Sequence, residues 1–238
     1  MQNKLTNQQE ITQWFNSTYK RFGLAYLRPV EAYQLFLELL QPQSGGKILD
    51  VACGPGQLLI AANPHQLKLY GVDISEVAVQ LCKRKLPSAT VNCANAEALP
   101  FADKSFDYIT CLGSLERFID REQALKEQWR VAKPGASFCF LVRNANNFKW
   151  KFIKQTLGLQ NMTGHQDALS LTQWRSLFAA IGFEEIKVLP DHWPKLKWKH
   201  YFLSPLGVKP AYKKVPIAQT SIEHANEFIF LLRKKNIG

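Results

Sequence analysis

A chain of 238 residues with 46% hydrophobic residues has enough apolar surface for the core of one ordinary to large domain. No charge-free apolar run approaches the ~20 residues that span a bilayer, and residues 1–10 do not resemble a secretory signal, so neither a membrane span nor secretion is expected. The five cysteines are scattered without a Cys-x-x-Cys pair, which predicts neither a zinc site nor a disulfide framework and favours a reduced, cytoplasmic protein.

The net charge of +11 is distributed unevenly along the chain. Residues 48–142 carry ten basic and ten acidic side chains, whereas residues 190–238 carry nine basic and three acidic ones. Four of the six tryptophans also follow residue 143. A basic, aromatic segment can bind an anionic substrate, a membrane surface or nucleic acid, or it can be a solvated surface, and composition leaves these alternatives open.

Two helices are predicted near the N-terminus. Apolar and aromatic residues recur at helical spacing from Ile11 to Tyr19, and Gly23 is suited to end that helix. A second helix is expected to begin at Pro29, a good first-turn residue, and to stop before Pro42. Both helices carry an apolar stripe that would pack on a neighbouring layer.

The stretch of residues 47–61 is the most informative part of the chain. A short apolar run, a glycine-rich turn and a helical pattern follow one another, which is typical of a buried parallel strand leading into a helix. The dinucleotide fingerprint fails because Leu59 occupies the place of its third glycine, and no Gly-Lys-Ser or Gly-Lys-Thr makes a phosphate loop. What remains is an acid, Asp50, followed by Gly54 and Gly56 at the edge where open α/β sheets bind ligands.

The chain continues with alternating strands and helices. Residues 69–75 predict a second short strand that ends in Asp73, and an acid at that place suits the two hydroxyls of a ribose. Ser75 is suited to cap the helix predicted for residues 76–84. The remaining predicted elements are strands at residues 90–94, 106–112, 137–142, 185–189 and 226–233, and helices at residues 122–131, 148–159 and 171–183.

These segments resemble the class I, Rossmann-like S-adenosylmethionine-dependent methyltransferases, of the small-molecule type. The segments that carry the resemblance are residues 47–61, 69–75, 95–109 and 128–136. The resemblance implies a seven-stranded, mostly parallel, doubly wound sheet whose last strand is antiparallel. It also implies a single domain over residues 1–238, comprising a helical cap (1–46), a cofactor-binding core (47–143) and a C-terminal half (144–238) with substrate-side insertions at 144–170 and 190–225.

The resemblance implies S-adenosylmethionine as the cofactor. It places the ribose hydroxyls at Asp73 and the adenine amino group at Asn95, where the family usually has an aspartate. It also makes Arg28, Tyr19 and Tyr26 candidates for binding the methionine carboxylate. The expected cofactor-binding residues are Arg28, Asp50, Ala52, Gly54, Gly56, Asp73, Ile74, Asn95, Ala96, Glu97, Leu112 and Gly113.

The resemblance also directs attention to the end of the fourth predicted strand, which faces the reacting end of the cofactor. Relatives often carry a histidine where Arg117 stands, so Arg117 is expected to orient the acceptor without taking its proton, while Glu116 can assist it or cap the next helix. The substrate side is expected to include His165, Asp167, Asp191 and His192, although a lone histidine is more often a surface or packing residue. A general base is needed only if the acceptor arrives protonated. The sequence shows no cluster of metal ligands.

The expected function is therefore methyl transfer to a small molecule at oxygen, nitrogen or carbon, with an anionic acceptor as one alternative. The middle of the chain most resembles methyltransferases of quinone biosynthesis and small metabolites. A second hypothesis is an RNA or protein methyltransferase that uses the basic arm at residues 190–225, although no Asn-Pro-Pro-Tyr type segment follows the fourth strand. A third is a non-catalytic module that binds the cofactor or contacts a membrane surface.

Overall fold

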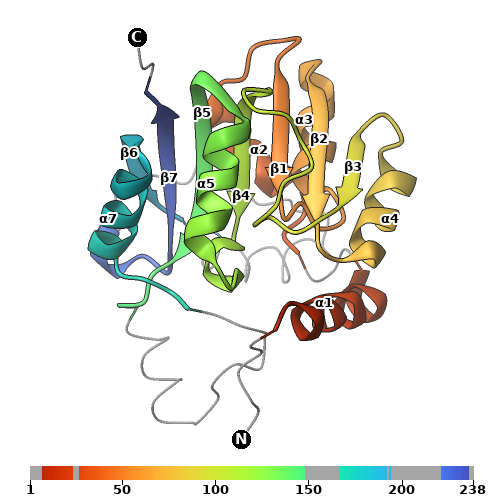
Figure 1. The fold of residues 1–238 in the computed structure, drawn as a ribbon, viewed down its shortest axis with the longest axis horizontal. Helices are drawn as coiled ribbons and strands as arrows, with labels where there is room; N and C mark the ends of the chain where they lie inside the picture. The colour runs from red at the N-terminus through yellow and green to blue at the C-terminus, as the bar shows by residue number, and fades with distance from the viewer. Residues whose placement is uncertain (1–6, 24–26, 148–166, 192, 194–220, 236–238) are drawn as a thin grey trace, which may run out of the picture.

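The computed structural model describes residues 7–23, 27–147, 167–191, 193 and 221–235 (Figure 1). The helix predicted for residues 148–159, the candidates Tyr26, His165 and His192, and most of the basic arm lie outside the described residues. Within the described ranges, no helix is long and apolar enough to cross a bilayer.

A seven-stranded sheet forms the centre of the molecule, with the strand order β3-β2-β1-β4-β5-β7-β6 (Figure 1). The strands are β1 (Lys47–Val51), β2 (Lys68–Asp73), β3 (Thr90–Cys93), β4 (Phe106–Leu112), β5 (Ala132–Arg143), β6 (Phe183–Pro190) and β7 (Glu227–Lys234). Neighbouring strands from β3 to β5 are parallel, whereas β7 is antiparallel to both β5 and β6, which confirms the predicted sheet. Because β7 runs in the opposite direction, its first residue, Glu227, pairs with Arg143 at the end of β5.

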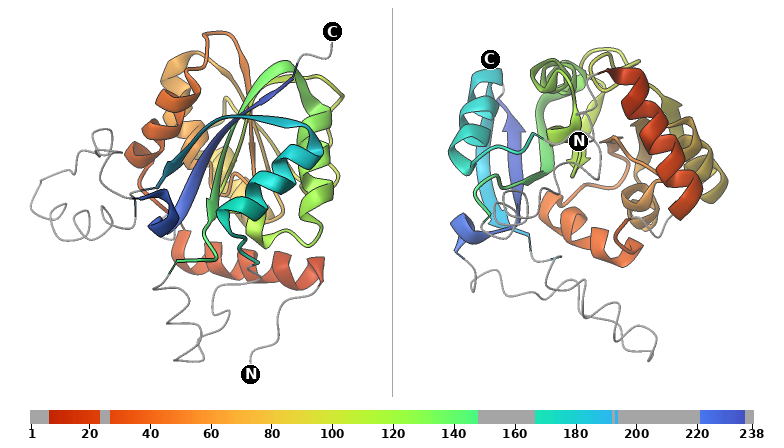
Figure 2. Two further views of the ribbon diagram at one scale, coloured as in Figure 1. Left: turned by 90° about the vertical axis from the view of Figure 1, so that its left-hand side faces the viewer. Right: turned by 90° about the horizontal axis from the view of Figure 1, so that it is seen from below.

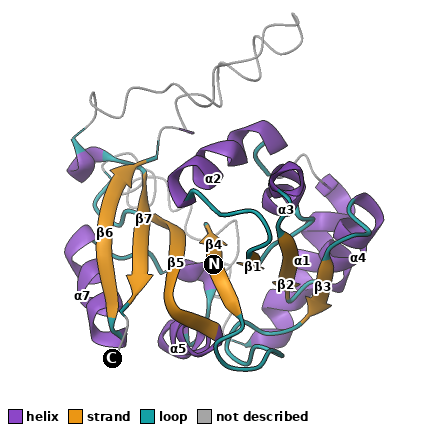
Figure 3. Cartoon of the chain, turned by 90° about the horizontal axis from the view of Figure 1, so that it is seen from above, coloured by secondary structure: helices purple, strands orange, loops and turns teal. Residues whose placement is uncertain are grey.

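Helices cover both faces of this sheet (Figures 1 and 3). One layer contains α2 (Gln34–Leu40), α3 (Gln57–Ala62) and α4 (Glu76–Lys85), and the other contains α5 (Arg121–Val131) and α7 (Leu171–Ile181). Successive residues of β5 are buried alternately in the two layers: Phe138 and Phe140 pack with α5 and α7, and Cys139 and Leu141 with the first layer. Burial on both faces explains why these strands are nearly continuous apolar runs.

The first helix, α1 (Gln8–Phe22), stands apart from both layers and lies across the carboxyl ends of the strands (Figures 1 and 2). It ends at Gly23, as predicted. Ser75 caps α4, also as predicted, by accepting a hydrogen bond from the Ala78 amide at 3.2 Å. The same hydroxyl donates to the side-chain oxygen of Asn16 at 2.6 Å, so the start of α4 holds α1 in its place over the sheet.

Two predicted boundaries differ from the structure. The second N-terminal helix begins with a 3₁₀ turn, Val30–Tyr33, before α2. The fifth strand begins at Ala132, well before its predicted start, because Ala132 pairs with Phe106 of β4. The register then shifts, and this irregularity accommodates Pro134 and Gly135, which lie between the predicted helix at 122–131 and the predicted strand at 137–142.

Candidate active site

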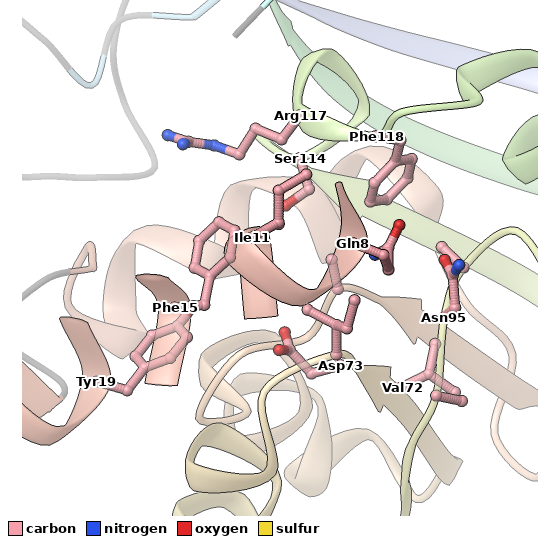
Figure 4. Close-up of a pocket in the computed structure, with 14 residues that line it drawn as sticks. Gln8, Ile11, Phe15, Tyr19, Val72, Asp73, Asn95, Ser114, Arg117 and Phe118 are labelled. Carbon is pink, nitrogen blue, oxygen red and sulfur yellow. The ribbon is translucent and has the colours of Figure 1, made fainter. Parts of the chain in front are cut away.

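Two adjoining cavities lie at the carboxyl ends of the strands, and Figure 4 shows the first of them. The first, the α1 cavity, lies between side chains of α1 and the strand ends, and its walls include Ile11, Phe15, Tyr19, Asp73, Asn95 and Ala96. The second, the arginine cavity, has a volume of about 460 Å³, and its walls include Arg28, Tyr33, Arg117, Arg143, Trp193 and Glu227. The two cavities meet because they share Phe15, Tyr19, Ala52, Ser114 and Arg117.

The turn after β1 borders both cavities at Ala52 and the arginine cavity at Gly54, and its two glycines are required by geometry. Gly54 and Gly56 both have positive φ angles, of 52° and 86°. A Cβ atom on Gly54 would lie 2.9 Å from the Tyr19 hydroxyl oxygen, and one on Gly56 would lie 2.3 Å from the Cys82 sulfur. Neither position therefore accepts a side chain without rearrangement, and the backbone of Gly54 remains open to the arginine cavity.

Ala52 stands at the junction of the two cavities and also has a positive φ angle, of 58°. This left-handed conformation costs an alanine about 1–2 kcal/mol relative to the ordinary helical region. Strained backbone of this kind often occurs at ligand-binding turns. The sequence placed Ala52 among the cofactor-binding residues but did not predict its conformation.

Asp73 ends β2 as predicted, and its carboxylate is buried at the α1 cavity (Figure 4). Its two oxygens accept hydrogen bonds from the backbone amides of Gly54 at 2.7 Å and Ser75 at 2.8 Å. Burial raises the pKa of this carboxyl to about 6, against the lowering effect of the two amides. Since a carboxylate has about four lone-pair sites, the two amides orient Asp73 and leave it able to accept from a ligand hydroxyl.

A second buried acid, Asp50, lies at the end of β1 and lines the arginine cavity. The Thr110 hydroxyl donates to its carboxylate at 2.6 Å. Burial raises the pKa of Asp50 to about 7, with Thr110 lowering it and Asp73 adding to the rise. A cationic ligand group beside these two acids would favour their ionised forms.

The far wall of the α1 cavity contains three of the predicted residues, Ile74, Asn95 and Ala96. Ile11 and Phe15 of α1 line the same cavity, so apolar side chains from the helix and from the strand ends both contribute to its walls. The side-chain oxygen of Asn95 accepts from the Glu97 amide at 3.0 Å. The Glu97 carboxylate accepts from the backbone amide of residue 120 at 3.0 Å and belongs to the wall of neither cavity.

The end of β4 contributes Leu112, Gly113 and Arg117 to the arginine cavity. The Arg117 guanidinium lies 5.7 Å from the centre of the Phe15 ring, which places it where the two cavities join. Glu116 points elsewhere: its side chain is fully buried, and neither carboxylate oxygen has a hydrogen-bond partner among the described residues. Among these predicted catalytic residues, only Arg117 therefore reaches a cavity.

A network of buried charges forms the other wall of the arginine cavity. Arg28 binds both oxygens of Asp191, at 3.1 and 2.7 Å, and also donates to Glu227 at 2.8 Å. The Nε atom of Arg143 lies 3.6 Å from Glu227 and 3.5 Å from Glu116. Arg28 thus lines the cavity as predicted for a ligand-binding residue, but the carboxylates that it contacts in the structure are those of the protein.

Sequence reasoning missed Arg143 and Glu227 as members of the site. One signal was present: a seventh strand that is antiparallel starts at the edge where the parallel strands end. Its first charged residue, Glu227, and the charged residue after β5, Arg143, must therefore meet at the ligand-binding edge. Trp193, which also lines the cavity, carried no comparable signal.

Comparisons with known proteins agree with this geometry. The family described as methyltransferase domain matches residues 49–140. The ubiquinone/menaquinone biosynthesis C-methyltransferase of Geotalea daltonii is 38% identical over 105 residues, which cover 40% of this chain and 45% of that protein. This chain therefore aligns with less than half the length of the first curated relatives that it matches, between 39% and 45% of them.

Two further proteins resemble a larger part of the chain. The demethylmenaquinone methyltransferase of Geobacillus stearothermophilus is 30% identical over 175 residues, which cover 62% of this chain and 75% of that protein. The crystal structure of the [4+2]-cyclase SpnF covers 98% of this chain and 97% of its own, with a TM-score of 0.69 and 18% identity, a likeness of fold alone. With its glycine turn, strand-end acids and sheet order, the chain belongs to the class I S-adenosylmethionine-dependent methyltransferase family.

Proposed function

We propose that this protein transfers a methyl group from S-adenosylmethionine to a small aromatic acceptor that carries an ionisable hydroxyl group. The observation that carries the proposal is the junction of the two cavities at Ala52, Ser114 and Arg117. A nucleoside in the α1 cavity and an acceptor in the arginine cavity would bring their reacting groups together at this junction.

The residues of the α1 cavity and the glycine turn fit the family's cofactor. Asp73 is oriented to accept from ribose hydroxyls, and Ile74 and Ala96 provide an apolar wall for adenine. Gly54 and Asp50 offer a close backbone approach and a buried acid to the amino acid portion. When bound, S-adenosylmethionine supplies a methyl group made electrophilic by its sulfonium.

The arginine cavity supports an aromatic, acidic acceptor. Tyr33 and Trp193 supply aromatic walls, and Arg28, Arg117 and Arg143 supply positive charge. Arginine neighbours favour the ionised form of a hydroxyl, which is the better nucleophile. The relatives named for ubiquinone, menaquinone and demethylmenaquinone point in the same direction, because quinols are aromatic rings with two such hydroxyls.

Two measurements test this proposal. Calorimetry should show binding of S-adenosylmethionine and S-adenosylhomocysteine to the purified protein. Transfer of labelled methyl should then be measured on 1,4-naphthohydroquinone, catechol, 4-hydroxybenzoate, phenethylamine and total RNA. We expect label on one or more of the hydroxylated rings; label on the amine or RNA alone would contradict the proposed acceptor class.

Two other functions have specific observations in their favour. The net charge of +11 favours a macromolecular acceptor such as RNA, with the basic arm as the contact region. The intact glycine turn and the buried Asp73 are equally compatible with a module that binds the cofactor without transferring its methyl group. Label on RNA would support the first, and cofactor binding without label on any acceptor would support the second.

The cytoplasmic location and the peripheral membrane contact stay predictions.

A further inference from the structure

We infer that Glu227 is the general base of the arginine cavity, which takes the proton from a ring hydroxyl of the acceptor while Arg28 and Asp191 act as positioning residues. The inference rests on the proposed function and adds the group that generates the nucleophile. The acceptor O–H bond breaks, an O–H bond forms on a Glu227 oxygen, and the electron pair stays on the acceptor. The resulting phenolate is nucleophilic at oxygen and at the ortho carbon, so the step serves transfer to either atom. The proton later passes from Glu227 to water.

The position of Glu227 is the first argument. It is the first residue of β7, and its side chain, 17% exposed, lines the arginine cavity. Asp50 is the other carboxylate in the described wall, but it lies beside the glycine turn and accepts from the Thr110 hydroxyl. Glu227 is therefore the carboxylate that faces the acceptor side.

The second argument is the orientation of its two oxygens. Arg28 donates to Oε2 at 2.8 Å, and Asp191 holds the same guanidinium through two hydrogen bonds of 2.7 and 3.1 Å. Oε1 lies 3.6 Å from Nε of Arg143, which is beyond hydrogen-bond distance. One oxygen thus fixes the carboxylate and the other is placed to accept a proton.

The electrostatic surroundings suit this role. Burial raises the pKa of the Glu227 carboxyl to about 7, although Arg28 and Arg143 act in the opposite direction. The charged and titratable groups that face it are Arg28, Asp191, Arg143, Glu116 and Tyr33. Tyr33 is no competing base, because burial raises the pKa of its hydroxyl and keeps it protonated. A base that titrates near neutrality is close to the optimum for proton transfer.

The first test needs no turnover. The probe is 2,4-dinitrophenolate, an anion throughout the range from about pH 5.5 to about pH 8.5, which imitates the deprotonated acceptor. Its affinity for the parent protein should fall by about tenfold as the pH rises through 7, since Glu227 is neutral below its pKa and repels the anion above it. In Glu227→Gln most of this fall should disappear, leaving only the smaller contribution of Asp50 on the other side of the cavity, whereas in Asp50→Asn most of the fall should persist.

The second test uses a hydroxylated ring that the protein methylates. Glu227→Gln should lower kcat by about 10²- to 10⁴-fold while the KM of the acceptor and the affinity for S-adenosylhomocysteine change by no more than about twofold. The loss should shrink for rings with more acidic hydroxyls, because these arrive already ionised. The matched control is Glu223→Gln, an exposed glutamate four positions earlier, which should behave like the parent.

The outcomes separate the two proposals. If no ring is methylated, the proposed function fails, and the dinitrophenolate titration still decides whether Glu227 titrates in the cavity. If rings are methylated with equal kcat and pH profile in parent and Glu227→Gln, the inference is wrong and the proposed function stands. A pH dependence that disappears in Asp50→Asn and remains in Glu227→Gln would transfer the role to Asp50. Retained affinity for S-adenosylhomocysteine shows that Glu227→Gln is folded, and a cooperative thermal unfolding transition like that of the parent shows it for Asp50→Asn.

Discussion

The two cavities of this protein share a wall but are built on different principles. The α1 cavity uses strand ends, and its acid, Asp73, is oriented by backbone amides of the glycine turn and of Ser75. The arginine cavity uses charged side chains from separate segments: Arg28 meets partners 163 and 199 positions away. The first site is thus specified by backbone conformation, and the second by long-range pairing of buried charges.

This difference predicts how each cavity responds to amino-acid substitutions. A site that backbone geometry specifies tolerates few substitutions but needs few particular side chains, which suits a ligand common to a whole family. A site made of buried charges can change its specificity by exchanging one side chain, but each exchange leaves a partner without its counter-charge. The following predictions test this distinction, from the largest expected effect to the smallest.

Removing the central charge of the arginine cavity should have the largest effect on stability. In Arg28→Met, Asp191 and Glu227 lose their shared partner, and the free energy of unfolding should fall by about 3–5 kcal/mol. The loss should be larger at pH 8 than at pH 5.5, because the Glu227 carboxyl, whose pKa burial raises to about 7, is protonated at the lower pH and then no longer needs a counter-charge. Loss of the arginine also removes the effect that lowers the pKa of Glu227, so protonation of the folded state begins at a higher pH.

Urea unfolding at the two pH values measures this effect, and Arg175→Met is the control. Arg175 forms a paired contact with Glu185 of comparable length, 2.9 Å, but both side chains are partly exposed. The control should lose less than about 1 kcal/mol at either pH. Equal losses in the two variants would mean that burial adds nothing to the Arg28 network.

A side chain on the glycine turn should have the next largest effect. Gly56→Ala combines a left-handed backbone with a Cβ atom 2.3 Å from the Cys82 sulfur, so we expect a loss of about 2–4 kcal/mol in unfolding free energy. Gly45→Ala isolates the backbone component, because Gly45 has a similar φ of 80° and nothing within 4 Å of the added atom. It should lose only about 1–2 kcal/mol.

The Cys82 contact can be tested further by a double-mutant cycle. Gly56→Ala should cost less in a Cys82→Ala background than in the parent, since the sulfur atom that the new methyl group meets is gone. No coupling between the two substitutions would show that the turn shifts away from α4 instead of pressing against it.

Asp73→Ala should weaken cofactor binding by about 1.5–3 kcal/mol, the range of a hydrogen bond to a charged group. Calorimetry with S-adenosylmethionine measures the affinity. Thermal unfolding shows how far the variant is destabilised by loss of the hydrogen bonds from the Gly54 and Ser75 amides. Asp103→Ala, an acid on the outside of the core that pairs with Arg130, is the matched control and should bind normally. Unchanged affinity in a folded Asp73→Ala protein would remove this acid from the cofactor site.

The smallest effect is expected for Ala52→Gly, which should raise the free energy of unfolding instead of lowering it. Ala52→Gly relieves a left-handed conformation that costs about 1–2 kcal/mol but adds freedom to the unfolded chain, so the net stabilisation should be below about 1 kcal/mol. Ala180→Gly in α7, at an exposed helical position, should instead destabilise by about 1 kcal/mol. A loss at both positions would show that the methyl group of Ala52 makes contacts that outweigh its strain.

Much of the fold followed from the sequence because its signals are local. Apolar runs bounded by glycines define the parallel strands, Ser75 caps α4, and Gly23 and Gly182 end their helices. Asp73 located the α1 cavity, and Asp50 with the glycine turn located the adjoining part of the arginine cavity, since the carboxyl ends of parallel strands share one edge. The strands, the caps and the turn depend on residues close in sequence, and the strand-end acids follow from the parallel order of the strands.

The arginine cavity could not be derived in this way. Which carboxylates reach Arg28, and whether Glu116 faces a cavity or the core, depends on how β7, the end of β6 and the segment before α2 pack together. The sequence position of a charged residue does not indicate which opposite charge it will contact. The free energy of burying a charged side chain also depends on every group within several ångströms. The sequence therefore determined the strands, the turn and the strand-end acids of the cofactor side, whereas only the tertiary structure decided which distant charges form the acceptor side.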